Sequence, residues 1–405
     1  MATTDPVHDL RVIGIVGAAH GGSHYFHLVL PPLFPILKAT FGVSFTELGL
    51  LVSVLFATSG LCQTPAGFLV DRIGAARVLA AGLALLGVGA MLAGLAPVFW
   101  ALLPAAVLMG LGNSVFHPAD YAILSHHVAA KRMARAFSIH TVGGTLGWAI
   151  APVLVAGIAA AVSWRAALMF SGALGLALAL LVYSNRALLE TPGHKAAAPT
   201  GVATELTGHL RLFATMPILL CFAFFALQAT SFIALQNFMP VTLHQLYNLD
   251  LMTATTTVTA LMIGSAGGTM VGGVWADRSG QHRRIIVCGL ALAAIVLTLI
   301  GRVQFPLPAL LAAVALAGAL AGLTTPSRDM LVRAAAPPGA SGKVFGFVYS
   351  GLDLGATLTP ILIGSLLDAG RIHAVFVVAP LAMAASILTV TTIPARRTGP
   401  VTAET

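Results

Sequence analysis

The sequence predicts an all-α membrane protein with twelve transmembrane helices in two six-helix, pseudo-symmetric bundles. Hydrophobic residues make up 58% of the 405 residues and charged residues only 8%, whereas about 25% of a soluble domain is charged. Apolar segments recur at the length of a membrane-spanning helix, about 20 residues. Features of the first half of the chain also recur in the second half. These observations argue against a water-soluble fold and for a duplicated helical bundle.

Apolar segments bounded by charged residues, Pro or Gly define the expected helices. They cover residues 11–37, 46–70, 76–96, 98–125, 134–161 and 164–184, and then 211–243, 251–276, 284–302, 307–333, 341–367 and 372–394. A polar segment rich in Pro, Gly and Ala lies between the two sets. The expected organisation is therefore a first bundle (1–184), a linker on the cytoplasmic side (185–210) and a second bundle (211–405).

The positive charges predict the orientation of the chain in the membrane. Of the 21 Lys and Arg residues, sixteen fall on one side of the expected helices, four on the other, and Arg328 within a helix. Cytoplasmic segments carry an excess of Lys and Arg, so both termini are expected in the cytoplasm. The net charge of +8 then indicates membrane orientation and contact with anionic lipid, not a nucleic-acid partner.

The two halves are related by a nearly constant offset. A Gly-x-x-x-Asp-Arg sequence before the third expected helix recurs 206 residues later, and three prolines recur after 208 residues: Pro32 and Pro240, Pro118 and Pro326, Pro152 and Pro360. Proline is scarce inside helices, so these coincidences indicate a tandem duplication of a six-helix unit. Parallel repeats with a site between them near the midplane are the organisation of a rocking carrier.

The repeated charged sequences are expected to be short loops, GFLVDRIGAARVL (67–79) and GVWADRSGQHRRI (273–285). Glycine permits close helix approach, and the charged side chains could form ion pairs between the bundles that break when the conformation changes. The alternative is a charged turn that only fixes the topology. The residues concerned are Gly67, Asp71, Arg72, Gly74, Arg77, Gly273, Asp277 and Arg278.

At these residues the chain resembles a known family. GFLVDRIGAARVL is similar to the loop signature of the major facilitator superfamily, and GGTLGWAIAP (143–152) resembles the glycine-proline element of its antiporters. GLGNSVFHPADYAILS (110–125), with LPPLFPIL (30–37), resembles the fosmidomycin-resistance group. The resemblance implies a major facilitator fold and proton-coupled export of a small organic anion or drug-like compound across a bacterial inner membrane by alternating access.

Alternatives to export stay open on the same fold. One is an importer or exchanger of a small anionic metabolite, and another is a metal-ion carrier. A membrane sensor or scaffold is disfavoured because the sequence leaves no room for a sizeable soluble domain, and an iron oxygenase would need several histidine pairs at one membrane face. No GxxxxGK[ST] sequence occurs, which disfavours nucleotide-driven pumping. We expect no enzyme activity, no cofactor, and a monomer that works with a solute, protons and the bilayer.

Three histidines form a stripe on the first expected helix. His20, His24 and His27, followed by Pro31, lie on one face at 3.6 residues per turn. Polar side chains in the hydrocarbon region are costly unless they face a cavity or a partner, and histidine exchanges protons near neutral pH. The stripe therefore predicts a solute or proton pathway. Histidines bonded within the helix packing, or ligands of a metal ion, are the alternatives.

A second set of candidates follows from the repeat. Asp120 and Arg328 are 208 residues apart and are expected to occupy pseudo-symmetric positions. Arg328 is expected to bind an anionic group, or to pair with Asp120 or Asp353 when the site is empty, because a lone guanidinium in hydrocarbon is unfavourable. The alternative is an Arg328 that reaches the cytoplasmic surface.

Other polar residues share helix faces with these. His117, Asp120 and Asp353 are the expected proton-handling groups. The supporting residues fall into three groups. Asn113, His117 and Tyr121 share one face of the fourth expected helix, and Tyr349 shares a face of the eleventh with Asp353. The seventh expected helix carries Gln228, the counterpart of His20 in the repeat, together with Gln236 and Asn237. The stretches 82–94, 264–273 and 316–322 are glycine-rich, and we expect them to be helix-packing surfaces rather than phosphate loops. No metal site is assigned.

Overall fold

The computed structural model describes residues 6–191, 213–335 and 341–392, and nearly all of them are helical. The first bundle contains α1 (Pro6–His27), η1 (Pro31–Leu33), α2 (Phe34–Phe41), α3 (Phe45–Ile73), α4 (Ala75–Leu95), η2 (Phe99–Ala101), α5 (Leu102–Asn113), α6 (Phe116–His127), η3 (Ala130–Arg132), α7 (Met133–Ala161) and α8 (Trp164–Ser184), followed by α9 (Arg186–Leu189). The second contains α11 (Met216–Tyr247), α12 (Leu251–Ser279), α13 (His282–Ile300), α14 (Leu307–Leu323), α15 (Thr325–Ala335), α16 (Ser341–Asp368) and α17 (Val375–Thr392).

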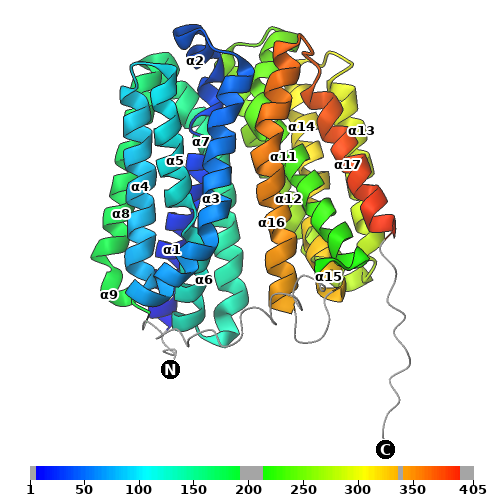
Figure 1. The fold of residues 1–405 in the computed structure, drawn as a ribbon. Helices are drawn as coiled ribbons and strands as arrows, with labels where there is room; N and C mark the ends of the chain where they lie inside the picture. Colours follow the sequence, from blue (N-terminus) through cyan, green and yellow to red (C-terminus); the bar gives the residue numbers. More distant parts are fainter. Residues whose placement is uncertain (1–5, 192–212, 336–340, 393–405) are drawn as a thin grey trace, which may run out of the picture.

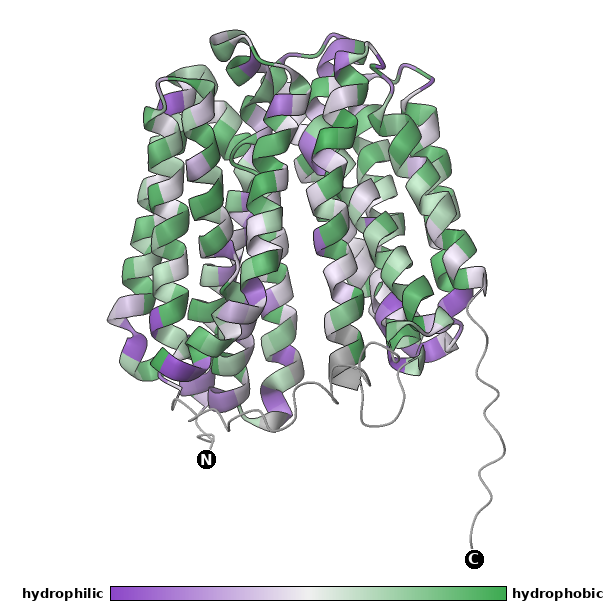
Figure 2. Cartoon of the chain, viewed as in Figure 1, coloured by the Kyte–Doolittle hydropathy of each residue, from purple (hydrophilic) through white to green (hydrophobic). Residues whose placement is uncertain are grey.

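Twelve membrane crossings are confirmed in the part of the chain that the structure describes. Eleven helical segments are long and apolar enough to cross a membrane. The twelfth crossing is α1, whose glycines and histidines make it more polar than the others. Hydrophobic residues cover the length of the helices and hydrophilic residues gather at the two ends (Figure 2), as a bilayer requires.

Two helices predicted as continuous are broken, at matching places in the two halves. The span 98–125 is divided between α5 and α6, and the span 307–333 between α14 and α15. Each break comes just before a proline, Pro118 or Pro326. Proline has no N–H for the carbonyl of the preceding turn and its ring clashes with that carbonyl. The repeated break supports the duplication inferred from the sequence.

The first helices of the two halves differ. The span predicted at 11–37 ends as α1 at His27 and resumes through η1 and α2, whereas α11 continues through Pro240. The first half has two consecutive prolines, Pro31 and Pro32, where the second has only Pro240. A single proline is accommodated within a helix, but the pair removes two successive donors.

The glycine-rich stretches are helix-packing surfaces, as predicted. An added Cβ at Gly82 or Gly87 would lie 2.8 or 2.7 Å from a backbone oxygen of a neighbouring helix, and at Gly268 only 2.0 Å from the carbonyl oxygen of Ala319. Side chains larger than hydrogen therefore cannot fit there without moving the helices apart. This is the small-residue packing typical of membrane bundles.

The bundles stand side by side (Figure 1). We call the end at which α1 begins and α17 ends the terminal end, and the other the opposite end. Helix α3 packs against α16, and α7 against α12. Close backbone contacts of the first pair lie toward the opposite end, where a Cβ on Gly49 would be 2.3 Å from the carbonyl oxygen of Pro360 and one on Gly364 would be 2.5 Å from that of Phe45.

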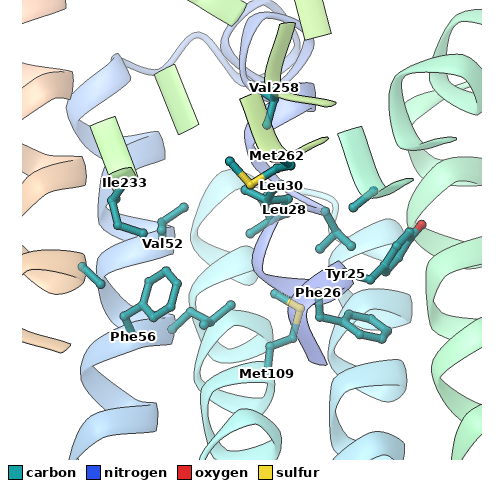
Figure 3. Close-up of a cluster of buried hydrophobic side chains, with 14 of the residues drawn as sticks. Tyr25, Phe26, Leu28, Leu30, Val52, Phe56, Met109, Ile233, Val258 and Met262 are labelled. Carbon is teal, nitrogen blue, oxygen red and sulfur yellow. The ribbon is translucent and has the colours of Figure 1, made fainter. Parts of the chain in front are cut away.

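Apolar side chains of both bundles are continuous across this contact. Ile233, Val258 and Met262 of the second bundle belong to the same buried cluster as Leu30 and Val52 of the first (Figure 3). Burial of apolar side chains against one another excludes water from the space between the bundles. In this conformation the contact between the bundles is therefore sealed toward the opposite end.

A carboxylate also joins the bundles at the opposite end. Asp368, the last residue of α16, accepts hydrogen bonds from the backbone N–H groups of Phe45 and Thr46, both at 2.8 Å, and from the Thr46 hydroxyl at 2.6 Å. The Lys38 ammonium lies 3.9 Å from it. The first N–H groups of a helix lack partners within it and favour negative charge, so Asp368 caps the first turn of α3 from the other bundle.

The charged sequences predicted as loops are mostly the last turns of helices. Gly67, Asp71 and Arg72 belong to α3, and the second copy belongs to α12, whereas Gly74 forms the turn before α4 with φ of 93°. Arg77 pairs with Glu190 at 3.6 Å. Within the described residues no ion pair involves Asp71, Arg72, Asp277 or Arg278. The predicted ion pairs between the bundles are thus not formed in this conformation, whose polar inter-bundle contacts are at the opposite end.

Most of the predicted linker (185–210) lies outside the described residues. Its first part docks on the first bundle, where Leu189 is fully buried and the Thr191 hydroxyl accepts a hydrogen bond from the Ala75 N–H at 3.2 Å. His127 contacts the Glu190 carbonyl oxygen at 2.9 Å. The boundary between the first bundle and the linker therefore remains a prediction, and residues 188–191 of the predicted linker pack against the first bundle.

Candidate functional site

The centre of the first bundle contains a carboxylate held by two imidazoles. Asp120 of α6 is fully buried, and its Oδ2 accepts hydrogen bonds from His20 Nδ1 of α1 at 3.1 Å and from His140 Nε2 of α7 at 3.0 Å. The two imidazole rings stack with centroids 3.6 Å apart. The other carboxylate oxygen, Oδ1, is buried without a hydrogen-bond partner. Three helices thus meet at one carboxyl group.

Glycines on α1 and α7 make this approach possible. A Cβ on Gly143 would be 2.5 Å from the carbonyl oxygen of Gly17, and one on Gly147 would be 2.0 Å from that of Gly21. One on Gly144 would be 2.5 Å from the Nδ1 atom of His24. The backbones therefore touch, and the missing side chain at Gly144 makes room for the histidine rings.

A second hydrogen-bond network continues along α1. Trp148 Nε1 donates to His27 Nδ1 at 3.2 Å, so the proton of the neutral His27 ring is on Nε2, which donates to Asn113 Oδ1 at 2.9 Å. Ser23 Oγ donates to the same oxygen at 2.7 Å, and the Asn113 amide donates to Ser59 Oγ at 2.9 Å. Every polar atom of the His27 ring therefore has a partner, and the ring orientation is fixed.

The predicted histidine stripe exists and faces the interior of the first bundle. His24 lies between its neighbours, with ring centroids 4.3 Å from His20, 5.1 Å from His27 and 3.9 Å from Trp148. Its Nδ1 atom is buried without a hydrogen-bond partner. Because both nitrogens of His27 are occupied, His20, His24 and His27 do not form the metal-ligand set considered from their spacing.

Two candidates on α6 are exposed. His117 and Tyr121 stack with ring centroids 5.9 Å apart, and Tyr121 is 45% exposed and 5.6 Å from the His140 ring. His117 lies 5.8 Å from the His20 ring. These side chains connect the buried centre of the first bundle with the accessible surface of α6.

The second bundle contains a different charged group. Arg328 Nε donates to Asp329 Oδ1 at 3.2 Å, and the guanidinium lies 4.9 Å from the ring centroid of Phe225. The Tyr349 hydroxyl donates to the same Asp329 oxygen at 3.0 Å. The expected pairing of Arg328 with Asp120 or Asp353 is therefore wrong for this conformation. Asp329 is adjacent in the chain and supplies the neutralising charge, while Asp120 is already bonded by two histidines.

The remaining candidates are dispersed. Asp353 of α16 lies at the contact between the bundles, where a Cβ on Gly60 of α3 would be 3.2 Å from the Asp353 Cβ. The Gln228 Nε2 atom and both amide atoms of Asn237 are buried without hydrogen-bond partners, whereas Gln236 donates to the Met262 sulfur at 3.3 Å. The structure does not place Gln228 or Asn237 in the histidine network.

Sequence reasoning missed five residues of these networks: Ser23, Ser59, His140, Trp148 and Asp329. The signal for His140 and Asp329 was present, because each is an ionisable residue inside an expected span, at 134–161 and 307–333, and such residues are candidates by default. Trp148 gave no such signal, since tryptophan is common in membrane helices. Only its position beside His24 and His27 identifies it.

The duplicated bundles with ionisable groups at their centres define a class, the polytopic membrane transporters. The family model of the Major Facilitator Superfamily matches residues 16–268 and 238–404. The chain therefore belongs to the Major Facilitator Superfamily. This confirms the family and fold expected from the sequence.

Individual relatives agree with this assignment. The MFS-type transporter YfnC of Bacillus subtilis (strain 168) is 25% identical over 88% of this chain and 87% of its own length. The Fosmidomycin resistance protein of Escherichia coli (strain K12) is 24% identical over 89% and 88%. A bacterial homolog of the human lysosomal transporter Spinster, solved in an inward-facing, unoccupied conformation, superposes with a TM-score of 0.74 at 17% identity over 96% of each chain.

Proposed function

We propose that this chain is a secondary active transporter that exports a small organic anion or drug-like compound in exchange for protons, by alternating access across the bacterial inner membrane. The observation that carries the proposal is the buried His20–Asp120–His140 group, which places a carboxylate and two imidazoles inside a membrane bundle. Ionisable groups there are costly and are retained where a substrate or proton passes. The relative named Fosmidomycin resistance protein supports export as the direction of transport and a drug-like compound as the class of substrate.

The orientation follows from charge. Lys38, Arg165, Arg302 and Arg371 are the basic residues at the opposite end, and the other described Lys and Arg residues, including Arg328 of α15, lie toward the terminal end. The positive-inside rule assigns the terminal end to the cytoplasm. The apolar seal and the Asp368 contact then close the periplasmic side, and the conformation is the one that releases or receives solute on the cytoplasmic side.

The two bundles have different tasks in this proposal. The first bundle holds and exchanges the proton, through the Asp120 carboxylate and the exposed His117 and Tyr121 that lead to it. The second bundle supplies the positive charge, Arg328, for an anionic group of the solute. When no solute is bound, Asp329 neutralises this charge, which lowers the cost of a guanidinium in an apolar region.

Transport in proteoliposomes with an imposed pH gradient tests the proposal. Vesicles are loaded with a panel of anionic metabolites, phosphonates and antibiotics, and flux is followed with the gradient in each direction and with the gradient collapsed by an ionophore. We expect flux opposite to the proton gradient, and its loss on collapse. The matched control is His373→Gln, a residue in the loop before α17 at the opposite end.

Other outcomes decide between the alternatives. Flux in the same direction as protons would establish an importer of an anionic metabolite and contradict export. Gradient-independent counterflow would contradict proton coupling. Accumulation of a divalent metal ion in place of organic solutes would establish a metal carrier. The monomeric state is tested by the mass of the detergent-solubilised protein that supports flux.

A further inference from the structure

We infer that His20, Asp120 and His140 form a binding site for a divalent transition-metal ion of the zinc type. Among the residues that the structure describes, this is the one group of three His, Cys, Asp or Glu side chains whose ligand atoms lie within 4.8 Å of one another. All three residues are buried. The inference concerns the same carboxylate to which the proposed function assigns the proton, so a bound metal ion would compete with proton uptake, but it is tested by binding at equilibrium and does not depend on the direction of transport.

The spacing of the ligand atoms suits such an ion. With metal–ligand bonds of about 2.0–2.2 Å in a tetrahedron, neighbouring ligand atoms are about 3.3–3.5 Å apart. Asp120 Oδ2 lies 3.1 Å from His20 Nδ1 and 3.0 Å from His140 Nε2. The third pair of ligand atoms, His20 Nδ1 and His140 Nε2, lies within 4.8 Å. One metal ion in place of the two bridging hydrogens would contact all three atoms once the two imidazole rings, now stacked with centroids 3.6 Å apart, turn toward it.

The chemistry of the donors selects the ion. Two imidazoles and one carboxylate suit zinc and its first-row neighbours, whereas magnesium and calcium prefer oxygen ligands alone. The carboxylate supplies negative charge in a site from which water is largely excluded. Its second oxygen, Oδ1, is buried without a partner and is available to a metal ion as a second contact.

The ligand set consists of these three residues. The His24 ring is tilted against the His20 ring with centroids 4.3 Å apart, and His24 is not among the side chains whose ligand atoms lie within 4.8 Å of one another. The contact of α1 with α7 through Gly143 and Gly147 holds the helices that carry these ligands at a fixed separation, which favours a preformed site.

Zinc binding to the purified, metal-free full chain in detergent tests the inference. We expect one tight site by isothermal titration calorimetry. Changes of outer-shell groups weaken metal affinity about 10–100-fold, so the loss of a ligand in His140→Ala should weaken it at least tenfold or so. The matched control is His373→Ala, at the opposite end, which should leave the affinity unchanged. Equal affinities in the two variants would overturn the inference, as would the absence of a one-to-one site in the wild type.

Two further measurements keep the test decisive if His140→Ala folds poorly. His140→Gln keeps an N–H donor for Asp120 but removes the imidazole ligand, and its thermal unfolding without metal is compared with that of the wild type. X-ray absorption of the zinc-loaded wild type needs no variant, and at least two imidazoles in the metal shell are expected. A shell without imidazole would overturn the inference. Because no gradient or solute is involved, failure of the transport assay leaves this result unaffected.

Discussion

The two bundles share one scaffold but differ in the polar groups at their centres. Gly143 and Gly147 of α7 touch the backbone of α1, and Gly351 and Gly355 of α16, each 208 residues later, touch the backbone of α11 in the same way. The proline-associated breaks match as well. The polar groups do not match, since the first bundle has a bonded histidine network and the second has an arginine beside an aspartate. Duplication has therefore preserved the packing contacts while the chemistry diverged.

The two bundles also differ in whether their interior amide groups have hydrogen-bond partners. In the first bundle His27 and Asn113 have partners for each of their polar side-chain atoms. In α11 of the second bundle, both amide atoms of Asn237 and the Gln228 Nε2 atom are buried without partners. Buried polar groups without partners are rare and costly. The first bundle also has such atoms, among them Asp120 Oδ1 and His24 Nδ1, but these two lie within the histidine network, whereas Gln228 and Asn237 belong to no described network.

The largest expected effect is on Asp120. Asp120→Asn replaces the carboxylate by an amide that cannot take up a proton, so we expect at least a roughly tenfold loss of proton-coupled flux. The lost hydrogen bonds to a charged group, about 1.5–3 kcal/mol each, should also lower the melting temperature. Flux in proteoliposomes and thermal unfolding are measured side by side with the His373→Gln control. Unchanged flux would show that the first bundle does not carry the proton.

Arg328→Gln is the corresponding test of the second bundle. We expect transport of anionic solutes to be lost while expression is retained, because an amide cannot replace the charge of the guanidinium. Arg328→Lys serves as the matched variant that keeps the charge but loses the planar fork. If transport of an anionic solute continues in Arg328→Gln, the assignment of anion recognition to this bundle is wrong.

Matched glycine substitutions test the shared scaffold. A Cβ on Gly147 would be 2.0 Å from the carbonyl oxygen of Gly21, and one on Gly355 would be 2.4 Å from that of Ala226. We expect Gly147→Val and Gly355→Val each to destabilise the protein by about 1–3 kcal/mol, seen as a lower melting temperature. Gly67→Val is the control, since a Cβ there has no atom within 4 Å. A normal melting temperature in only one variant would show that the packing is not equivalent.

The helix starts at the opposite end give a subtler contrast. Both α3 and α12 have an N-cap of their own, Ser44 and Asp250, and each accepts from the backbone N–H three residues later. Helix α3 has in addition Asp368 of α16, which accepts from its first N–H groups across the bundles. Asp368→Asn should therefore favour opening of the opposite end by about 1–2 kcal/mol. Spin labels at the ends of α3 and α16 measure this as a longer distance. If the distance distribution matches that of wild type, Asp368 does not hold the bundles together.

Asp250→Ala should affect stability alone, by about 1 kcal/mol, as expected for an N-cap. The hydrogen bonds from Thr253 lower the pKa of Asp250. Because the pKa is lower in the folded state, this contribution is present above the unfolded pKa of about 3.9 and is lost as the pH falls through the folded value. The melting temperature of the variant should therefore be lower than that of the wild type at pH 7, and the two should become equal at low pH. A shift in transport direction or labelling distances would contradict a purely local role.

The composition and the repeated prolines were sufficient to predict the membrane class, the twelve helices and the duplication. The length of an apolar segment and the effect of a proline on a helix depend on residues that are close together in the chain, so both can be recognised in the sequence. The histidine stripe was predicted for the same reason, since helical periodicity places His20, His24 and His27 on one face. The prediction of loops at 67–79 and 273–285 was wrong in part, because charged residues also occupy the last turns of helices at a membrane surface.

Only the tertiary structure decided which of the polar groups meet. Asp120 is 20 residues from His140 and 100 from His20, and no periodicity relates positions on α1, α6 and α7. The same holds for Asp368, which caps a helix more than 300 residues earlier. A sequence pattern shows on which face of its own helix a polar side chain lies. The residue that becomes its hydrogen-bond partner depends on how the helices pack. The sequence therefore determined the scaffold and its candidate residues, and the packing determined the pairs.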